Sequence, residues 1–273
     1  MQNLPNMIYG TAWKKEATEN CIFEAIKYGF KAIDTACQPK HYREDLVGMG
    51  LQKAYEKLNI KREDLFLQTK FTPIDGQDKA NMPYLESDSL DIQVEKSFET
   101  SKKNLKTNFI DSYILHSPIY PAKNLLTVWQ KMEEFVEKKE VGILGISNCY
   151  DLDVLKYLYN NTKIKPSIVQ NRFYAQTFYD ISIRNFCLEN GILYQSFWSL
   201  TANPHIVNSE SVLQIAKKYE KTPEQIFYRF LNHINIIPLN GTTSIFHMIE
   251  DMKISEFSLL DEEIKQIEDL LYR

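Results

Sequence analysis

The sequence predicts a single (β/α)8 barrel, the TIM-barrel class of α/β fold, over residues 1–273. Short buried-strand patterns alternate with longer segments of helical periodicity, and about eight such pairs can be counted, the number that closes a barrel. The length of 273 residues suits a fold that typically takes about 250. An open doubly wound sheet is the competing architecture, but no GxGxxG motif follows an early strand and the chain has only nine glycines.

Eight short runs rich in β-branched or aromatic residues are the predicted strands, and each is typical of a strand buried on both faces. In chain order they cover residues 7–9, 30–33, 65–67, 112–115, 141–144, 167–169, 192–194 and 236–237. Burial on both faces is expected for a parallel sheet that is covered by helices.

The segments between these runs are predicted helices, of which residues 125–140 are the clearest. Their apolar residues form one stripe opposite the charges, at i, i+1, i+4, i+7 and i+8. The stripe consists of Val128, Trp129, Met132, Phe135 and Val136. Two later helices have a start motif, because Thr222 supplies a capping hydroxyl ahead of Pro223 and Gln225, and Ser258 with Asp261 repeats that pattern before the last helix.

Composition indicates an ordinary soluble globular protein, with 44% hydrophobic residues, 25% charged residues and a net charge of −4. The chain lacks the basic excess that nucleic acid requires and has no apolar run long enough to span a membrane, so we expect neither partner. Residues 1–5 do not resemble a secretory signal, and we expect a cytoplasmic protein. Four widely spaced cysteines indicate buried, reduced thiols, neither zinc ligands nor a disulfide framework.

Polar and aromatic side chains follow the predicted strands, which is where a barrel enzyme carries its catalytic groups. Lys70 ends a strand that should be buried, and an ammonium group there requires a carboxylate partner. Asp34, at the end of the neighbouring strand, is the available one. His116 follows the next strand, either as an active-site group or as a core histidine.

Short motifs recur at these strand ends in a fixed order. They are GTAW at 10–13, AIDTA at 32–36, QTK at 68–70, LHSP at 115–118, GISN at 145–148, VQN at 169–171, and IP at 237–238 with GTTS at 241–244. Together they resemble the aldo-keto reductases over nearly the whole chain, and ACQPKHY at 36–42 resembles the fungal-type branch of that family.

The resemblance implies an NAD(P)H-dependent oxidoreductase that reduces small aldehydes or ketones and, in reverse, acts on alcohols. The catalytic tetrad of this family maps to Asp34, Tyr42, Lys70 and His116. Hydride transfer to a carbonyl leaves an alkoxide that needs a proton, and an unperturbed phenol with a pKa of about 10 donates slowly. Lys70 would lower that pKa, Asp34 would hold Lys70, and His116 would orient the carbonyl. No metal is required.

The resemblance also assigns a cofactor site. Ser147, Asn148 and Gln170 match the residues that bind the nicotinamide carboxamide, and Phe197 takes the place of the aromatic residue that stacks on the ring. The remaining cofactor-binding positions are Ser199, Leu200, Thr242, Thr243, Ser244, His247 and Asp251. Trp13, His41 and Trp198 would line the substrate pocket.

The cofactor is NADPH by family default, but the phosphate-binding stretch departs from the family pattern. Members that prefer NADPH place Lys after the Ile-Pro of the last strand and Arg on the following helix. This chain has Leu239, Asn240 and His247 in these places, so NADH is the alternative.

The position of the proton donor is also open. The family usually leaves four residues between the aspartate and the tyrosine, whereas seven separate Asp34 from Tyr42 here. By spacing from Val47, His41 takes the tyrosine's usual place, and Tyr42 lies one residue later. We expect Tyr42 to be the acid, with His41 as the alternative.

Two further expectations concern the surroundings of the pocket. Residues 72–91 form a long acidic segment that is either a lid or a solvated surface loop. The chain ends directly after its last predicted helix, where many relatives continue, so we expect an open pocket and broad, weak activity on small aromatic or aliphatic aldehydes. The resemblance also implies a monomer. The alternative function is a cofactor-binding regulatory or sensor protein with little turnover.

Overall fold

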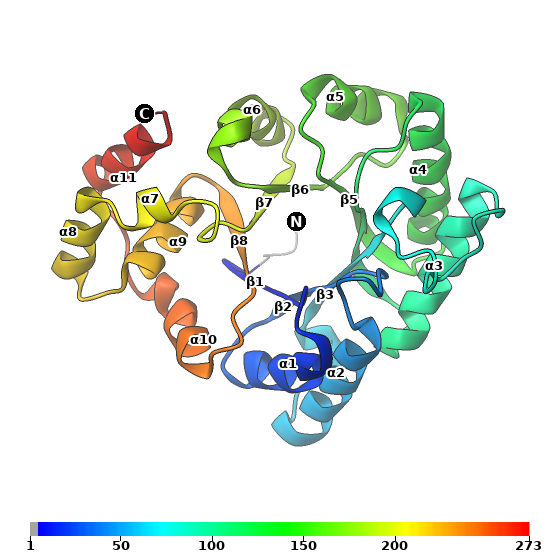
Figure 1. The fold of residues 1–273 in the computed structure, drawn as a ribbon, viewed down its shortest axis with the longest axis horizontal. Helices are drawn as coiled ribbons and strands as arrows, with labels where there is room; N and C mark the ends of the chain where they lie inside the picture. Colours follow the sequence, from blue (N-terminus) through cyan, green and yellow to red (C-terminus); the bar gives the residue numbers. More distant parts are fainter. Residues whose placement is uncertain (1–4, 273) are drawn as a thin grey trace.

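The structure, a computed structural model, describes residues 5–272 and confirms the (β/α)8 barrel. Eight parallel strands close into one barrel in chain order (Figure 1). The strands are β1 Ile8–Gly10, β2 Ala32–Asp34, β3 Phe66–Phe71, β4 Ile110–Leu115, β5 Val141–Ser147, β6 Ile168–Arg172, β7 Leu193–Phe197 and β8 Ile236–Asn240. The barrel closes where β1 pairs with β8 in parallel. Residues 1–4 lie outside the described part, and with them most of the segment in which we expected no secretory signal.

Helices alternate with the strands and form an outer ring (Figure 1). They are α1 Thr18–Lys27, α2 Glu44–Leu58, α3 Leu90–Leu105, α4 Ala122–Glu137, α5 Leu152–Asn161, α6 Ile181–Glu189, α7 Pro204–Val207, α8 Glu210–Tyr219, α9 Pro223–His233, α10 Ile245–Asp251 and α11 Asp261–Glu268. Short 3-10 segments are η1 Lys15–Ala17, η2 Arg62–Asp64, η3 Ile74–Gly76, η4 Ala175–Asp180, η5 Met252–Glu256 and η6 Asp269–Tyr272.

Each predicted strand is present, but several continue beyond the predicted C-terminal end. β3 runs through Gln68 and Lys70 to Phe71, and β7 runs to Phe197. The apolar pattern stops earlier because polar side chains at these ends point into the barrel mouth while the backbone ladder continues. The extra residues are the ones that form the candidate site.

The predicted helix at residues 125–140 overlaps α4, which ends at Glu137, and the start motif at Thr222 is confirmed. Thr222 is the N-cap of α9, and its side chain accepts a hydrogen bond from the Gln225 amide. The predicted start at Ser258 is wrong, because α11 has Leu260 at its N-cap and Glu263 accepts a hydrogen bond from the Leu260 amide at 2.8 Å. Ser258 instead accepts a hydrogen bond from Arg229.

Two apolar clusters stabilise the barrel. The larger one lies between the sheet and the helices. The smaller one takes one buried residue from each of five strands and consists of Ile8, Ala32, Phe66, Ile114 and Ile168. Four of these five residues begin their strands, so the small cluster lies mainly toward the N-terminal end of the barrel and leaves the C-terminal end to polar side chains.

The four cysteines are buried free thiols, as predicted. No helix in residues 5–272 is long and apolar enough to cross a membrane.

Candidate active site

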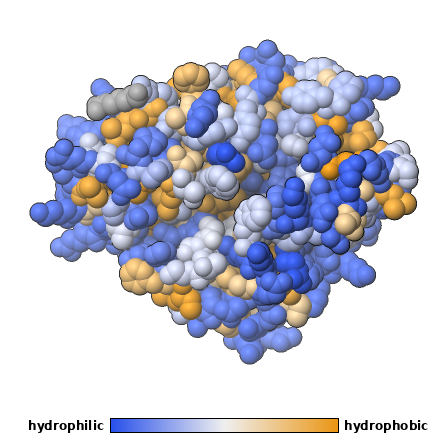
Figure 2. Space-filling model, viewed as in Figure 1, coloured by the Kyte–Doolittle hydropathy of each residue, from blue (hydrophilic) through white to orange (hydrophobic). Residues whose placement is uncertain are grey.

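A cavity of about 970 Å³ opens at the C-terminal ends of the strands. Figure 2 shows this face of the molecule, with a hollow near its centre. Most of the predicted site residues line the cavity: Trp13, Asp34, His41, Tyr42, His116, Ser147, Asn148, Gln170, Phe197, Trp198, Ser199, Leu200, Thr242, His247 and Asp251.

Three predicted site residues do not line the cavity. Lys70 is fully buried beneath it. Thr243 is exposed outside it, and Ser244 is the N-cap of α10, where its hydroxyl accepts a hydrogen bond from the His247 amide. Residues 72–91 supply none of the lining residues, so this segment does not cover the cavity in the structure.

Lys70 and Asp34 form a buried ion pair between neighbouring strands. Lys70 Nζ lies 2.5 Å from Asp34 Oδ2 and also donates to the Thr35 carbonyl at 2.9 Å. Burial lowers the pKa of Lys70, while the Asp34 carboxylate opposes this effect. A buried charge of this kind is tolerated only with such a partner.

Glutamine side chains complete the hydrogen bonding of the Asp34 carboxylate. Its Oδ1 accepts hydrogen bonds from Gln68 at 2.6 Å and from Gln170 at 3.0 Å. Both glutamines also donate to Gln195 Oε1 at 2.9 Å, so side chains from β2, β3, β6 and β7 hold one another. Both oxygens of the carboxylate therefore have partners, which fixes its orientation and that of Lys70.

Tyr42 lies directly above Lys70, with Lys70 Nζ 5.5 Å from the centroid of its ring. Burial, followed by the nearby Asp34 carboxylate, raises the pKa of the Tyr42 phenol above its usual range. The net lowering of this pKa that we expected is wrong, because burial and the Asp34 carboxylate outweigh the favourable effect of the Lys70 charge on the phenolate. The phenol therefore carries its proton at neutral pH.

His41 lies farther out, against Trp13. Its ring centroid is 3.9 Å from that of the indole, and its carbonyl accepts a hydrogen bond from the Trp13 amide at 2.8 Å. Tyr42 instead faces His116, with ring centroids 6.1 Å apart. Of the two candidates for the acid, Tyr42 is thus the one above Lys70 and beside His116.

His116 is held by a residue that the sequence did not single out. Thr72 Oγ1 lies 2.7 Å from His116 Nδ1. Burial, then the charge of Lys70, lowers the pKa of His116 well below its usual range, so the ring is neutral. When the Thr72 hydroxyl donates to Nδ1, the ring proton resides on Nε2.

Ser147, Asn148 and Gln170 form a second hydrogen-bonded group. Ser147 Oγ donates to the Gln170 carbonyl at 2.7 Å, and Asn148 Nδ2 donates to the His116 carbonyl at 2.9 Å. Both hydrogen atoms of the Gln170 amide group have partners in Asp34 and Gln195, whereas its Oε1 accepts no hydrogen bond from residues 5–272. Gln170 therefore offers an acceptor to a ligand.

Three lining residues hold left-handed backbone conformations, which are uncommon for residues other than glycine. The φ angles are 65° at Trp13, 52° at Asn148 and 55° at Trp198. For tryptophan such an angle is a strained conformation that the surrounding fold imposes, and such strain concentrates at functional sites. No sequence pattern indicates it.

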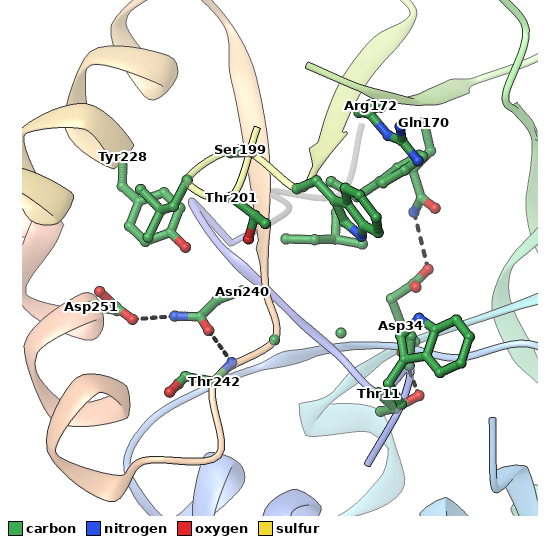
Figure 3. A pocket seen from close by; sticks show the side chains of 18 of the residues that line it. Thr11, Asp34, Gln170, Arg172, Ser199, Thr201, Tyr228, Asn240, Thr242 and Asp251 are labelled. Carbon is green, nitrogen blue, oxygen red and sulfur yellow. Dashed lines mark hydrogen bonds between the residues drawn. The ribbon is translucent and has the colours of Figure 1, made fainter. Parts of the chain in front are cut away.

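The end of the cavity farthest from Gln170 and His116 is acidic. Asp251 accepts a hydrogen bond from Asn240, whose Oδ1 accepts one from the Thr242 amide (Figure 3). Burial raises the pKa of Asp251 to about 7. Glu224 and Glu250 line the cavity as well. Lys14 donates to the Gly241 carbonyl at 2.7 Å and thereby supports the loop after β8, and burial lowers its pKa to about 8.

The family model described as "Aldo/keto reductase family" matches residues 6–271 of this chain. Among characterised relatives, the chain is 27% identical over 256 residues to a 9,11-endoperoxide prostaglandin H2 reductase of Trypanosoma cruzi, covering 93% of this chain and 82% of the relative. It is 26% identical over 256 residues to a glyoxal reductase of Bacillus subtilis, covering 93% and 83%.

Solved structures give the same result. The aldo-keto reductase MGS-M4 from a deep-sea metagenome library superposes with a TM-score of 0.84 at 26% identity, covering 98% of this chain and 92% of that one. An aldo-keto reductase determined in complex with NADPH superposes with a TM-score of 0.81 at 22% identity, covering 97% and 84%, which shows a shared fold.

Proposed function

The chain belongs to the aldo/keto reductase family, and from this premise we propose that it reduces small aldehydes or ketones with a reduced nicotinamide cofactor. One observation carries the proposal: the Tyr42 ring lies over the buried Lys70–Asp34 pair and beside His116. The raised pKa of Tyr42 and the lowered pKa of His116 favour the protonated phenol and the neutral imidazole that carbonyl reduction requires. We also propose that the protein consists of a single domain.

The cavity suits the cofactor. Its volume of about 970 Å³ lies at the upper end of the range of about 300–1,000 Å³ for ligand sites. Gln170 Oε1 is a free acceptor for the amide hydrogens of a carboxamide, and Phe197 supplies an apolar ring face beside it. Gly241 and Thr242 line the cavity just ahead of α10, and the N-terminus of a helix favours an anionic phosphate.

The bound cofactor supplies a hydride, and the chain's own residues handle the proton. His116 donates from Nε2 to the carbonyl oxygen and orients it, while Tyr42 gives up its proton as negative charge develops on that oxygen. Lys70 stabilises the resulting phenolate, and Asp34 keeps Lys70 charged and in place. In the reverse direction the Tyr42 phenolate is the base.

NADPH is the family default, but the charges at the adenosine end favour NADH. Within residues 5–272, no lysine or arginine lines that end, whereas Glu224, Glu250 and Asp251 do. A 2′-phosphate dianion would be repelled there, and a carboxylate is a suitable acceptor for a ribose hydroxyl.

Turnover distinguishes a reductase from a cofactor-binding sensor protein. The test incubates purified protein with NADPH or NADH and a panel of activated aldehydes, and follows the loss of reduced cofactor against a control without carbonyl. In parallel, equilibrium titration measures cofactor binding. We expect binding and turnover together, whereas binding without turnover across the panel would replace the reductase assignment with the sensor.

A further inference from the structure

Arg172 is a charged cavity residue that the proposed chemistry does not use. It ends β6, two residues after Gln170. Alternate residues of a strand face the same side at a spacing of about 6–7 Å, so Arg172 faces the cavity above Gln170 and nearer the mouth. Figure 3 shows it beside Gln170, across the cavity from Asn240, Thr242 and Asp251.

The guanidinium of Arg172 lacks the partners that the other arginines have. Each of the other four arginines in the described part of the chain donates from its side chain to protein acceptors: Arg43, Arg62, Arg184 and Arg229. Within residues 5–272, Arg172 makes no ion pair, and its buried Nε has no hydrogen-bond partner. The two terminal nitrogens of this guanidinium also have no acceptor within residues 5–272 and are not buried, so their N–H donors are accessible to a ligand.

Two aromatic rings hold this guanidinium without using its donors. Its central carbon lies 4.1 Å from the centroid of the Trp198 ring and 5.2 Å from that of Tyr174. The backbone amide of Arg172 donates to Tyr150 at 3.0 Å. Stacking fixes the plane of the group and leaves its N–H edges available, which is the arrangement that binds an oxyanion through two parallel hydrogen bonds.

The charge distribution of the cavity gives Arg172 a distinct role. It is the only lysine or arginine among the described lining residues, and the lining carboxylates other than Asp34 belong to the opposite end. An anion that enters beside the tetrad is therefore attracted to Arg172. We propose that Arg172 binds a carboxylate or phosphate group of the substrate, so that the preferred substrates are aldehydes or ketones that carry such an oxyanion. This inference rests on the proposed function.

Binding of unreactive analogues tests the inference independently of turnover. Because Trp198 stacks on Arg172, its fluorescence reports occupancy. The probes are benzoate for the carboxylate source, phenyl phosphate for the phosphate source, and benzamide as the neutral counterpart. We expect at least one of the two anions to bind wild type more tightly than benzamide does, and Arg172→Met to raise the Kd of that anion at least tenfold while the Kd of benzamide changes less than twofold.

The control is Arg229→Gln, which removes a half-buried arginine whose Nε likewise has no partner but which lies outside the cavity. This variant should bind all three probes as wild type does. Equal affinity of wild type and Arg172→Met for both anions, or no anion binding by wild type, overturns the inference.

A second experiment links Arg172 to catalysis. 4-Carboxybenzaldehyde is compared with its neutral methyl ester, and glyceraldehyde 3-phosphate with glyceraldehyde. Arg172→Met should lower kcat/KM for a preferred anionic substrate at least tenfold, leave its neutral counterpart within twofold, and leave the cofactor Kd unchanged. A parallel loss for charged and neutral substrates contradicts the inference, whereas absence of turnover with every substrate contradicts the proposed function and leaves the binding experiment to decide on Arg172.

Discussion

Thr72 is the residue that positions His116, through the 2.7 Å contact between its hydroxyl and Nδ1. Thr72→Val keeps the side-chain shape and removes this hydrogen bond, so the Nε2–H tautomer loses its support. A hydrogen bond of about 0.5–1.5 kcal/mol corresponds to a loss in kcat of about twofold to tenfold. We expect that loss without a change in the cofactor Kd, and recovery in Thr72→Ser. Imidazole nitrogen chemical shifts report the tautomer directly, and identical shifts in wild type and Thr72→Val would refute this role.

Asp251 should make stability depend on pH. Its pKa is raised to about 7 from the usual 3.8, so between about pH 4 and 7 the native state holds a proton that the unfolded chain has lost. The free energy of unfolding contributed by this group therefore falls as pH rises through this window and is constant above it. At about 1.4 kcal/mol per pKa unit, the fall is at most about 4 kcal/mol.

Asp251→Asn removes this titration and keeps an oxygen that accepts from Asn240. Thermal unfolding without cofactor at a series of pH values checks the effect. The Tm of the variant minus that of wild type should increase by several degrees from pH 5 to pH 8, since about 1 kcal/mol shifts the Tm of a chain this large by about 2 °C or more. A difference that stays flat over this range would show that Asp251 does not titrate there.

Among individual residues, the sequence predicted those whose chemical role follows from their position at the end of a strand. An ammonium on a buried strand requires a carboxylate, and this indicated the Lys70–Asp34 pair before any coordinates. Thr72 and Gln195 were missed because their contacts depend on side-chain rotamers and on the register between strands. The raised pKa of Tyr42 was missed because it depends on the degree of burial, which residue spacing does not give.

Among the elements, α2 connects the active site to the outer ring of helices, because it begins at Glu44, two residues after Tyr42. It packs on α3 through Gly48, where an added Cβ would lie 1.9 Å from the Asn104 carbonyl oxygen. Gly48→Ala would therefore push the two helices apart.

Overpacking of this kind costs about 1–3 kcal/mol, offset by about 1 kcal/mol of helix propensity. We expect Gly48→Ala to lower both the Tm and kcat, whereas Glu56→Ala, an exposed change on the same helix, should alter neither. Differential scanning calorimetry and steady-state kinetics measure the two effects. A Gly48→Ala protein with wild-type Tm would show that α2 and α3 are not in close contact at this point.

Periodicity predicted the elements better than it predicted their ends. The apolar stripe of α4 and the cap of α9 depend on local sequence alone, and the structure has both. The predicted cap at Ser258 was wrong because a tertiary contact with Arg229 uses its hydroxyl, and Glu263 caps the helix instead.

At the scale of the whole molecule, cofactor binding should stabilise the closed barrel against unfolding. A ligand that binds only the native state at 100 times its Kd stabilises it by about 2.7 kcal/mol, or roughly 5 °C in Tm for a chain of this size. Both cofactors should raise the Tm. At equal concentration NADH should raise it more than NADPH, because in the proposed binding mode the 2′-phosphate would lie near Glu224, Glu250 and Asp251.

Glu224→Gln should reduce the difference in Tm shift between the two cofactors, and a larger shift with NADPH in wild type would show that the acidic end does not select against the phosphate.

The fold class itself followed from the count of strand and helix pairs. The choice of cofactor did not, because Glu224 and Glu250 come from separate helices whose approach to the same end of the cavity only the closed barrel produces.

The central claim is that Tyr42 is the proton donor of a carbonyl reductase. Its most direct test is kcat with an activated aldehyde and saturating cofactor for Tyr42→Phe and His41→Ala, beside wild type. General acid catalysis contributes about 100-fold or more. Tyr42→Phe should therefore lose at least that factor while it binds cofactor with the wild-type Kd, and His41→Ala should stay within tenfold of wild type. Full activity in Tyr42→Phe, or abolished turnover in His41→Ala alone, would contradict the account.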